Sequence, residues 1–254
     1  MVAPVSLKKV AFITGSSRGL GRAMALRLAK EGVAIIVSAA NSDEAGKKVV
    51  EEIRAIDGEA IFCRCNVRDR DAVKKAVAAG IDAFGPINIL INNAGWMVPL
   101  PFEQNDEAYW DRVLDTKIRG SLYTVHAVLP SMKECGWGKI INITGDAGRV
   151  GLTNGVVHTG AQGALQSMTK SWARELAKYG IRVNAVSPGP IESEQQKDVF
   201  ATGGSQISNE INIGMFGVGK PDDIAAAVAF FVRNEADHIT GQILSVNGGR
   251  AFPS

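Results

Sequence analysis

Short apolar runs and amphipathic stretches alternate along the whole chain. Apolar runs that suit buried strands cover 10–13, 33–39, 60–65, 87–92, 139–143, 181–187 and 242–246. Stretches with helical spacing of apolar residues lie between them, over 22–30, 42–56, 70–84, 107–129, 160–179 and 222–232. Runs as apolar as Ile87-Asn88-Ile89-Leu90-Ile91 are typical of strands that are covered on both faces. The alternation therefore predicts a parallel sheet with helices on both sides.

No linker or repeat interrupts this alternation within the 254 residues. We therefore expect a single doubly wound α/β domain over 1–254, with about seven parallel strands. The polar segment 194–216 fits neither pattern and contains Gly203, Gly204 and Ser205. We interpret it as a lid over a substrate, and the alternative is a simple surface excursion.

Composition and charge narrow the classes of function. The chain is 46% hydrophobic and 21% charged, with a formal net charge of +2 and no basic run, which argues against a nucleic-acid partner. No apolar stretch is long enough to span a bilayer, and 1–9 lacks the apolar core of a signal peptide. We therefore expect a cytoplasmic protein without a membrane partner.

Three cysteines, Cys63, Cys65 and Cys135, cannot all be paired in disulfides. The spacing of Cys63 and Cys65 fits alternation along a strand better than a metal site, because no second His or Cys pair accompanies it. We expect reduced thiols and no metal.

A glycine-rich turn, Thr14 to Gly21, joins the first predicted strand to the first helix. Gly15 permits a tight turn, Gly19 lets the backbone approach a pyrophosphate, and Gly21 lets helix and strand pack closely. The helix N-terminus adds free N–H groups and a partial positive charge. This context predicts a dinucleotide site, in which the contacting residues are Gly15, Ser17, Arg18, Gly19, Leu20 and Gly21.

Ligands of open α/β sheets bind beyond the carboxyl ends of the strands. The residues that should meet there beside the glycine turn are Asn41, Asn66, Val67, Asn93, Ala94, Gly95, Thr144, Asp146, Pro188, Gly189, Ile191 and Ser193. We expect the amide of Asn93 to fix the backbone near the nucleotide. The loop from Pro188 to Ser193 is expected to meet the nicotinamide carboxamide.

The charges after the second strand indicate which cofactor is preferred. Enzymes that prefer NAD place an acid there for the ribose hydroxyls, whereas 39–42 holds no acid and Asp43 comes one residue later. Arg18 in the glycine turn is suited to a 2′-phosphate. We therefore expect NADP(H) rather than NAD(H), and the alternative is a fold that binds no cofactor.

Several motifs occur in the order typical of one family. They are the glycine turn, Asn92-Asn93-Ala94-Gly95, the run 110–115, the run 181–189 and Asp222-Asp223-Ile224-Ala225. With these motifs the chain resembles the short-chain dehydrogenase/reductase family over its whole length, and most closely the 3-oxoacyl-acyl-carrier-protein reductase branch. The resemblance implies a Rossmann-type fold, a nicotinamide dinucleotide and a dimer or tetramer built through helices.

The resemblance also implies a catalytic tetrad of Asn, Ser, Tyr and Lys. In that family the tyrosine exchanges a proton with the substrate and the lysine lowers its pKa. The serine orients the carbonyl group, and the asparagine holds a water molecule. The matching positions in this chain are Lys117, Gly145, His158 and Gln162. All four groups differ, so the family's usual mechanism is not expected here.

Three interpretations follow. The favoured one is a pseudoenzyme that keeps the fold, as a homo-oligomer or as the partner of an active paralogue. In the second, an atypical reductase uses His158 as acid or base, Lys117 as the cation, Thr144 or Asp146 to orient the substrate, and Gln162 on the ribose. In the third, His158 with Asp146 or Lys117 performs dehydration or isomerisation. The run from Trp96 to Leu100 favours a small apolar substrate.

Overall fold

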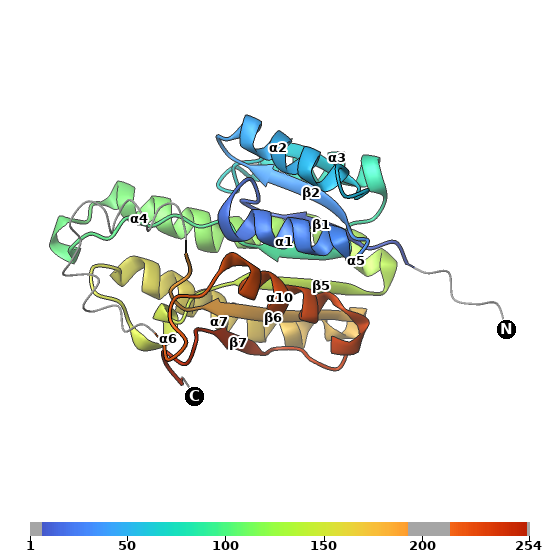
Figure 1. The fold of residues 1–254 in the computed structure, drawn as a ribbon. Coiled ribbons are helices and arrows are strands. Elements are labelled where there is room, and N and C mark those ends of the chain that lie inside the picture. Colours follow the sequence, from blue (N-terminus) through green and yellow to red (C-terminus); the bar gives the residue numbers. More distant parts are fainter. Residues whose placement is uncertain (1–6, 193–213, 253–254) are drawn as a thin grey trace.

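Seven parallel strands form one sheet in the computed structural model, which describes residues 7–192 and 214–252. The strand order is β3-β2-β1-β4-β5-β6-β7 (Figure 1). The strands are β1 (Val10–Ile13), β2 (Ala34–Ala39), β3 (Ala60–Arg64), β4 (Ile89–Asn92), β5 (Gly138–Ile143), β6 (Ile181–Pro188) and β7 (Ile243–Val246). The chain passes from β3 back past β1 to β4, so the order of the strands reverses between β1 and β4. This arrangement confirms the doubly wound fold.

Helices cover both faces of this sheet. One face carries α1 (Gly19–Lys30), α2 (Asp43–Arg54) and α10 (Pro221–Val232), and the other carries α3 (Arg70–Phe84), α5 (Gly120–Cys135) and α7 (Val156–Leu176). The side chains of β1 alternate between the two cores: Ala11 and Ile13 point to the first, Val10 and Phe12 to the second. All four are at most 1% exposed, as expected for a strand buried on both sides.

The helix predicted over 107–129 differs in the structure. It consists of α4 (Glu107–Leu114), a π-helical turn (Asp115–Arg119) and α5, which continues to Cys135. Pro130 lies inside α5 on an exposed face, where water can satisfy the carbonyl group that its missing N–H leaves unpaired. Gly136, with φ of +60°, ends the helix in the left-handed conformation.

The helix predicted over 160–179 begins earlier, at Val156, directly after Gly155. It ends in a short 3₁₀ turn (Ala177–Tyr179). Gly160 therefore lies inside α7, where it is exposed and a side chain would meet no neighbour within 4 Å. A short helix, α6 (Ala147–Val150), links β5 to this segment.

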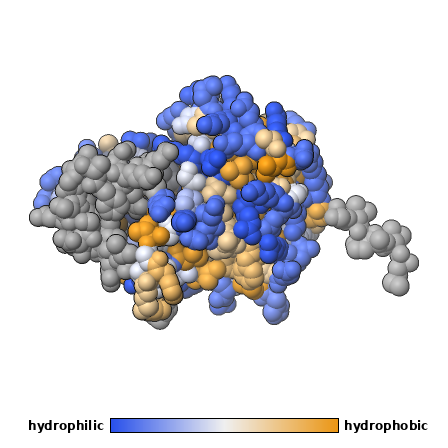
Figure 2. Space-filling model, in the orientation of Figure 1, coloured by the Kyte–Doolittle hydropathy of each residue, from blue (hydrophilic) through white to orange (hydrophobic). Residues whose placement is uncertain are grey.

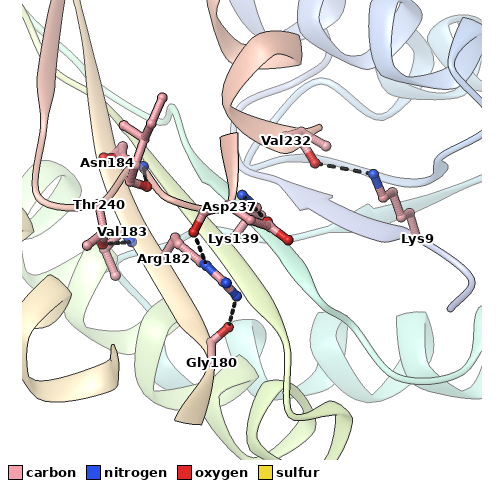
Figure 3. A network of polar contacts seen from close by, with 10 residues as sticks. Lys9, Lys139, Gly180, Arg182, Val183, Asn184, Val232, Asp237 and Thr240 are labelled. Atoms are coloured by element: carbon pink, nitrogen blue, oxygen red, sulfur yellow. Dashed lines mark hydrogen bonds and ion pairs between the residues drawn. The ribbon is translucent and has the colours of Figure 1, made fainter. Parts of the chain in front are cut away.

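A polar network closes the amino ends of the strands, opposite the glycine turn (Figure 3). Lys139 of β5 is fully buried, and its Nζ lies 2.7 Å from Asp237 Oδ1. Burial lowers the pKa of Lys139, and the carboxylate of Asp237 opposes this shift. Arg182 of β6 donates to the carbonyl groups of Asp237 and Gly180, both at 2.8 Å. These contacts fix the segment after α10 and so direct β7 onto the edge of the sheet.

The outer surface is of mixed polarity. Figure 2 shows hydrophilic residues over much of the face that carries α1 and α2, with hydrophobic residues gathered in separate areas. Large exposed apolar side chains include Phe230 of α10 and Leu244 of β7, at 40% and 39% exposure. Within the described parts of the chain, every helix is too short or too polar to cross a membrane.

Candidate functional site

A cleft of about 830 Å³ lies at the carboxyl ends of the strands. It is lined by all of the residues predicted for the dinucleotide, except Ser193, which lies outside the described residues. Those residues are Gly15, Ser17, Arg18, Gly19, Leu20, Gly21, Asn41, Asn66, Val67, Asn93, Ala94, Gly95, Gln162, Pro188, Gly189 and Ile191. His158, Thr144, Gly145 and Asp146 also line it. The fold thus brings together segments that are far apart in the sequence.

The glycine turn has the geometry that its sequence predicts. Gly15 has a φ of +62°, which favours glycine at the first bend. A Cβ atom on Gly21 would lie 2.3 Å from the carbonyl oxygen of Gly15, so a larger residue there would force the turn apart. The first helix begins at Gly19, and its N-terminal N–H groups therefore face the cleft beside this turn.

Hydrogen bonds to Thr14 and Asn93 hold the glycine turn against β4. Thr14 Oγ1 accepts from the backbone N–H groups of Asn93 and Ala94, both at 2.9 Å. Asn93 Nδ2 donates in return to the carbonyl groups of Thr14 and Gly15, at 2.9 and 3.0 Å. The amide of Asn93 thereby fixes the backbone that surrounds the cleft.

One end of the cleft lies beyond β2 and β3 and is rich in cations. Arg18, an exposed residue at the N-cap of α1, and Arg68 both line it, together with Asn41 and Ser42. Arg68 lies 4.0 Å from Asp115, whereas Arg18 makes no ion pair within the described residues. The only acids that line the cleft among the described residues, Asp146 and Glu192, follow β5 and β6.

His158 and Gln162 lie one helical turn apart near the start of α7. Gln162 is 4% exposed, and its Nε2 lies 3.0 Å from His158 Nε2. The other amide atom, Gln162 Oε1, is buried and has no hydrogen-bond partner within the described residues. Burial and the nearby charge of Lys117 lower the pKa of His158 to about 4, so the imidazole is neutral near pH 7.

Lys117 occupies the π-helical turn directly behind the cleft wall. It is 6% exposed, and its Nζ donates to the carbonyl groups of Ile143 at 2.8 Å and Ala94 at 3.4 Å. Burial lowers its pKa to about 8. Lys117 does not line the cleft itself, but Nζ lies 3.5 Å from the position that a Cβ atom on Gly95 would take.

Thr144 and Gly145, which follow β5, leave space in the cleft and offer no free hydroxyl group to a ligand. A Cβ atom on Gly145 would have its nearest neighbours on Gln162, at 3.7 Å. Thr144 is 5% exposed, and its Oγ1 donates to the carbonyl group of Val186 at 3.3 Å. Gln166 Nε2 donates to the carbonyl group of Gly145 at 3.1 Å. The hydroxyl group of Thr144 is therefore used within the protein.

Asp146 is fully buried, and its carboxylate is also satisfied by the protein. Ser245 Oγ donates to Asp146 Oδ1 at 2.9 Å, and Asn247 Nδ2 donates to Asp146 Oδ2. Asn247 also donates to the carbonyl group of Ala251 at 2.8 Å. The carboxylate thus anchors β7 and the loop that follows it to the end of β5.

Three arginines that line the cleft, Arg68, Arg112 and Arg250, are absent from the residues predicted by sequence. Arg112 of α4 lines the cleft and lies 4.0 Å from the ring centroid of Trp96. Arg250 reaches the cleft from the loop after β7. The predicted lid, 194–216, lies mostly outside the described residues. Its described end includes Met215 and Phe216, which are 76% and 89% exposed.

Comparisons with known proteins agree with this fold. Residues 15–251 match the sequence model of the enoyl-(acyl carrier protein) reductase family. The chain is 37% identical over 245 residues to the 3-oxoacyl-[acyl-carrier-protein] reductase FabG of Staphylococcus aureus, covering 96% of this chain and 99% of that protein. It is 32% identical over 244 residues to FabG of Thermotoga maritima, covering 95% and 97%.

Several solved structures are also similar to this chain. A mutant short-chain dehydrogenase/reductase of Serratia marcescens superposes with a TM-score of 0.88 at 32% identity, covering 96% of this chain and 98% of that one. A blue fluorescent protein from a metagenomic library, in complex with NADPH, gives a TM-score of 0.87 with the same identity and coverage. The order of the strands, the glycine turn and these matches together establish that the chain belongs to the short-chain dehydrogenase/reductase family.

Proposed function

We propose that this protein binds NADP(H) in the cleft and acts as a non-catalytic subunit, in a homo-oligomer or beside an active paralogue. The NADPH complex of the metagenomic relative supports the choice of cofactor. The unusual set of residues at the reaction end supports the absence of the family's usual chemistry.

Three features of the cleft fit a phosphorylated dinucleotide. The close packing of Gly15 against Gly21 leaves the helix N-terminus open to a pyrophosphate. The buried, unpartnered Gln162 Oε1 would accept a hydrogen bond from a ribose hydroxyl group. Arg18 would meet a 2′-phosphate, because no acid precedes Asp43 beyond β2 to favour the free hydroxyl group.

The observation that carries the non-catalytic role is the pairing of His158 with Gln162. At the position where the family has its proton-donating tyrosine, a neutral imidazole is held by an amide instead of being activated by a lysine. Loss of a positioned acid or base costs about 10²–10⁴ in rate, and loss of a hydrogen bond to the developing oxyanion about 10²–10³. Gly145 supplies no side-chain donor to replace the serine.

A second candidate is an atypical reductase, and Lys117 is the observation that favours it. With a pKa of about 8, its ammonium group is a stronger acid than an ordinary lysine and lies beside Gly95 at the cleft wall. The sequence interpretation assigns the proton transfer to His158 and the positive charge to Lys117, but a pKa of about 4 leaves His158 without a second proton to donate near pH 7. In this candidate Lys117 would therefore supply the proton after hydride transfer, and His158 would hold the substrate oxygen.

Calorimetric titration with NADPH and NADH, followed by turnover assays, tests both candidates. The non-catalytic proposal expects NADPH to bind at micromolar concentration and NADH more weakly. It also expects no oxidation of NADPH with a 3-oxoacyl thioester, the substrate class named for the relatives. Turnover that is lost in K117M would favour the atypical reductase. Failure of both nucleotides to bind would contradict both candidates.

A further inference from the structure

The contact between His158 and Gln162 favours one tautomer of the imidazole. With Gln162 Nε2 facing the ring, the amide donates, and His158 Nε2, 3.0 Å away, accepts. Because the pKa of His158 is lowered to about 4, the ring is neutral and its single proton sits on Nδ1. No hydrogen bond within the described residues involves Nδ1, and His158 lines the cleft. The ring therefore offers an N–H donor to a ligand.

Lys117 adds a positive charge that the described residues do not balance. Its Nζ donates only to the carbonyl groups of Ile143 and Ala94, and no carboxylate within the described residues lies at ion-pair distance. Gly95 separates this ammonium group from the cleft with no side chain of its own. A buried cation in this position favours a negative charge on a ligand at the same end.

The rest of this end of the cleft is apolar or small. Trp96, Met97 and Leu152 contribute apolar side chains, while Gly145 leaves room opposite Gln162. A ligand that fits has an apolar body and one oxygen atom that carries negative charge. A neutral imidazole N–H stabilises such an oxygen without giving up its proton, as a neutral histidine does in known enolising enzymes.

We infer that this end of the cleft binds an apolar carbonyl compound in its enolate form, with the enolate oxygen accepting from His158 Nδ1 beside Lys117. The proton lost by the carbonyl compound goes to solvent, so the protein takes up none. The inference rests on the proposed function in that the ligand shares the cleft with the dinucleotide, and it adds the chemical class of that ligand.

The tautomer of His158 is tested by NMR on protein labelled with ¹⁵N-histidine, in which H158N identifies the signals. The expected wild-type pattern is a protonated Nδ1 and an unprotonated Nε2. Q162E places a carboxylate acceptor beside Nε2 and should move the proton to that nitrogen, whereas Q162M should leave a mixture. A wild-type ring that is protonated on Nε2 would overturn the inference.

The ligand class is tested with acetylacetone, a 1,3-diketone whose enolate has its own near-ultraviolet absorption. Below the pKa of the free diketone, the wild-type protein should increase the enolate band in a saturable manner. H158F and K117M should each weaken this binding by about 10- to 100-fold, the usual effect of losing a charge-assisted hydrogen bond or a nearby charge. The matched controls H126F and K170M change exposed residues of the same types and should bind as the wild type does.

Titration of the same samples with NADPH separates the two proposals, and circular dichroism verifies that each variant is folded. Binding of NADPH without any enolate band would overturn the enolate inference and leave the proposed function standing. An enolate band that persists in folded H158F and K117M would also overturn it. An enolate band without NADPH binding would support the inference and contradict the proposed cofactor.

Discussion

The surroundings of His158 favour its neutral form. We therefore expect the folded protein to lose stability in acid. In the unfolded chain its pKa is the ordinary 6.5, whereas burial and Lys117 lower it to about 4 in the folded protein. Between these values the unfolded state binds more protons, so stability is lost as the pH falls from 6.5 to 4. The loss amounts to about 3 kcal/mol for this group.

H158F should remove this part of the acid sensitivity. The measurement is urea unfolding of wild type and H158F at several pH values between 7 and 4, because the difference between the two proteins isolates His158 from the carboxyl groups that also titrate. Equal pH dependence in the two proteins would mean that the imidazole is not buried as a neutral group.

Lys117 predicts a change of stability at alkaline pH. Its pKa falls from the ordinary 10.5 to about 8 on folding because the ammonium group loses its water. The unfolded chain therefore holds this proton over a range in which the folded protein has released it, and stability from this group rises between pH 8 and 10.5. The gain is about 3 kcal/mol.

K117M should lack this rise, since methionine fills similar space without a charge. Chemical unfolding of wild type and K117M from pH 7.5 to 10 provides the comparison, and K170M, altered at an exposed lysine, serves as the control. A difference between wild type and K117M that does not change with pH would contradict a buried ammonium group at this position.

At the scale of elements, the anchor between β5 and β7 depends on Asp146. D146A would leave Ser245 Oγ and Asn247 Nδ2 without their acceptor in a part-buried site. Loss of such buried hydrogen bonds to a charged group costs about 2–3 kcal/mol, so we expect a clear fall in the midpoint of thermal unfolding. The exposed acid Glu51 provides the control, and E51A should change stability by less than about 0.5 kcal/mol. If D146A unfolds at the wild-type midpoint, Asp146 does not anchor β7.

The elements were largely predictable because their signals are local. Apolar runs and helical periodicity depend on neighbouring residues, and all seven predicted strands occur in the sheet to within two residues at each end. The π-helical turn around Lys117 was not predictable, because the helix was expected to keep 3.6 residues per turn throughout, whereas the π turn adds one residue and shifts the phase of the apolar pattern between α4 and α5. The extension of α5 beyond Pro130 was not predictable either. A proline usually ends a helix, and the sequence does not show that Pro130 lies on an exposed face where the helix can continue.

The cleft was predictable where the sequence pattern and the sheet agree, as for the glycine turn and Asn93. It was not predictable where partners come from distant parts of the chain. The partners of Asp146 lie about a hundred residues away, at separations of 99 and 101, so the sequence alone did not show that its carboxylate is already satisfied. The same holds for Arg250, which enters the cleft only because the loop after β7 folds back.

At the scale of the whole molecule, the fold is that of its family, and the family resemblance leads us to expect that the reaction end differs at four positions. If those positions alone account for a lost activity, restoring them should restore it. The variant K117N/G145S/H158Y/Q162K combines the four residues that the family uses. A side chain at position 145 meets Gln162 only at the ordinary contact distance of 3.7 Å, so the serine should fit. K117N is required together with Q162K, because two ammonium groups at this end would repel each other.

We expect this fourfold variant to reduce a 3-oxoacyl thioester with NADPH at least about 100-fold faster than the wild type, the low end of what a positioned acid contributes. The control K117N/G145S/Q162K keeps His158 and should stay at the wild-type rate, because it restores the surroundings without the proton donor. Oxidation of NADPH is followed by absorbance, after titration has verified that each variant binds the nucleotide. If the wild type and the fourfold variant both oxidise NADPH at the same measurable rate, the residues now present already catalyse the reaction. A folded fourfold variant that binds NADPH but stays inactive would place the obstacle elsewhere, in the loops that shape the cleft around Trp96 and Arg250.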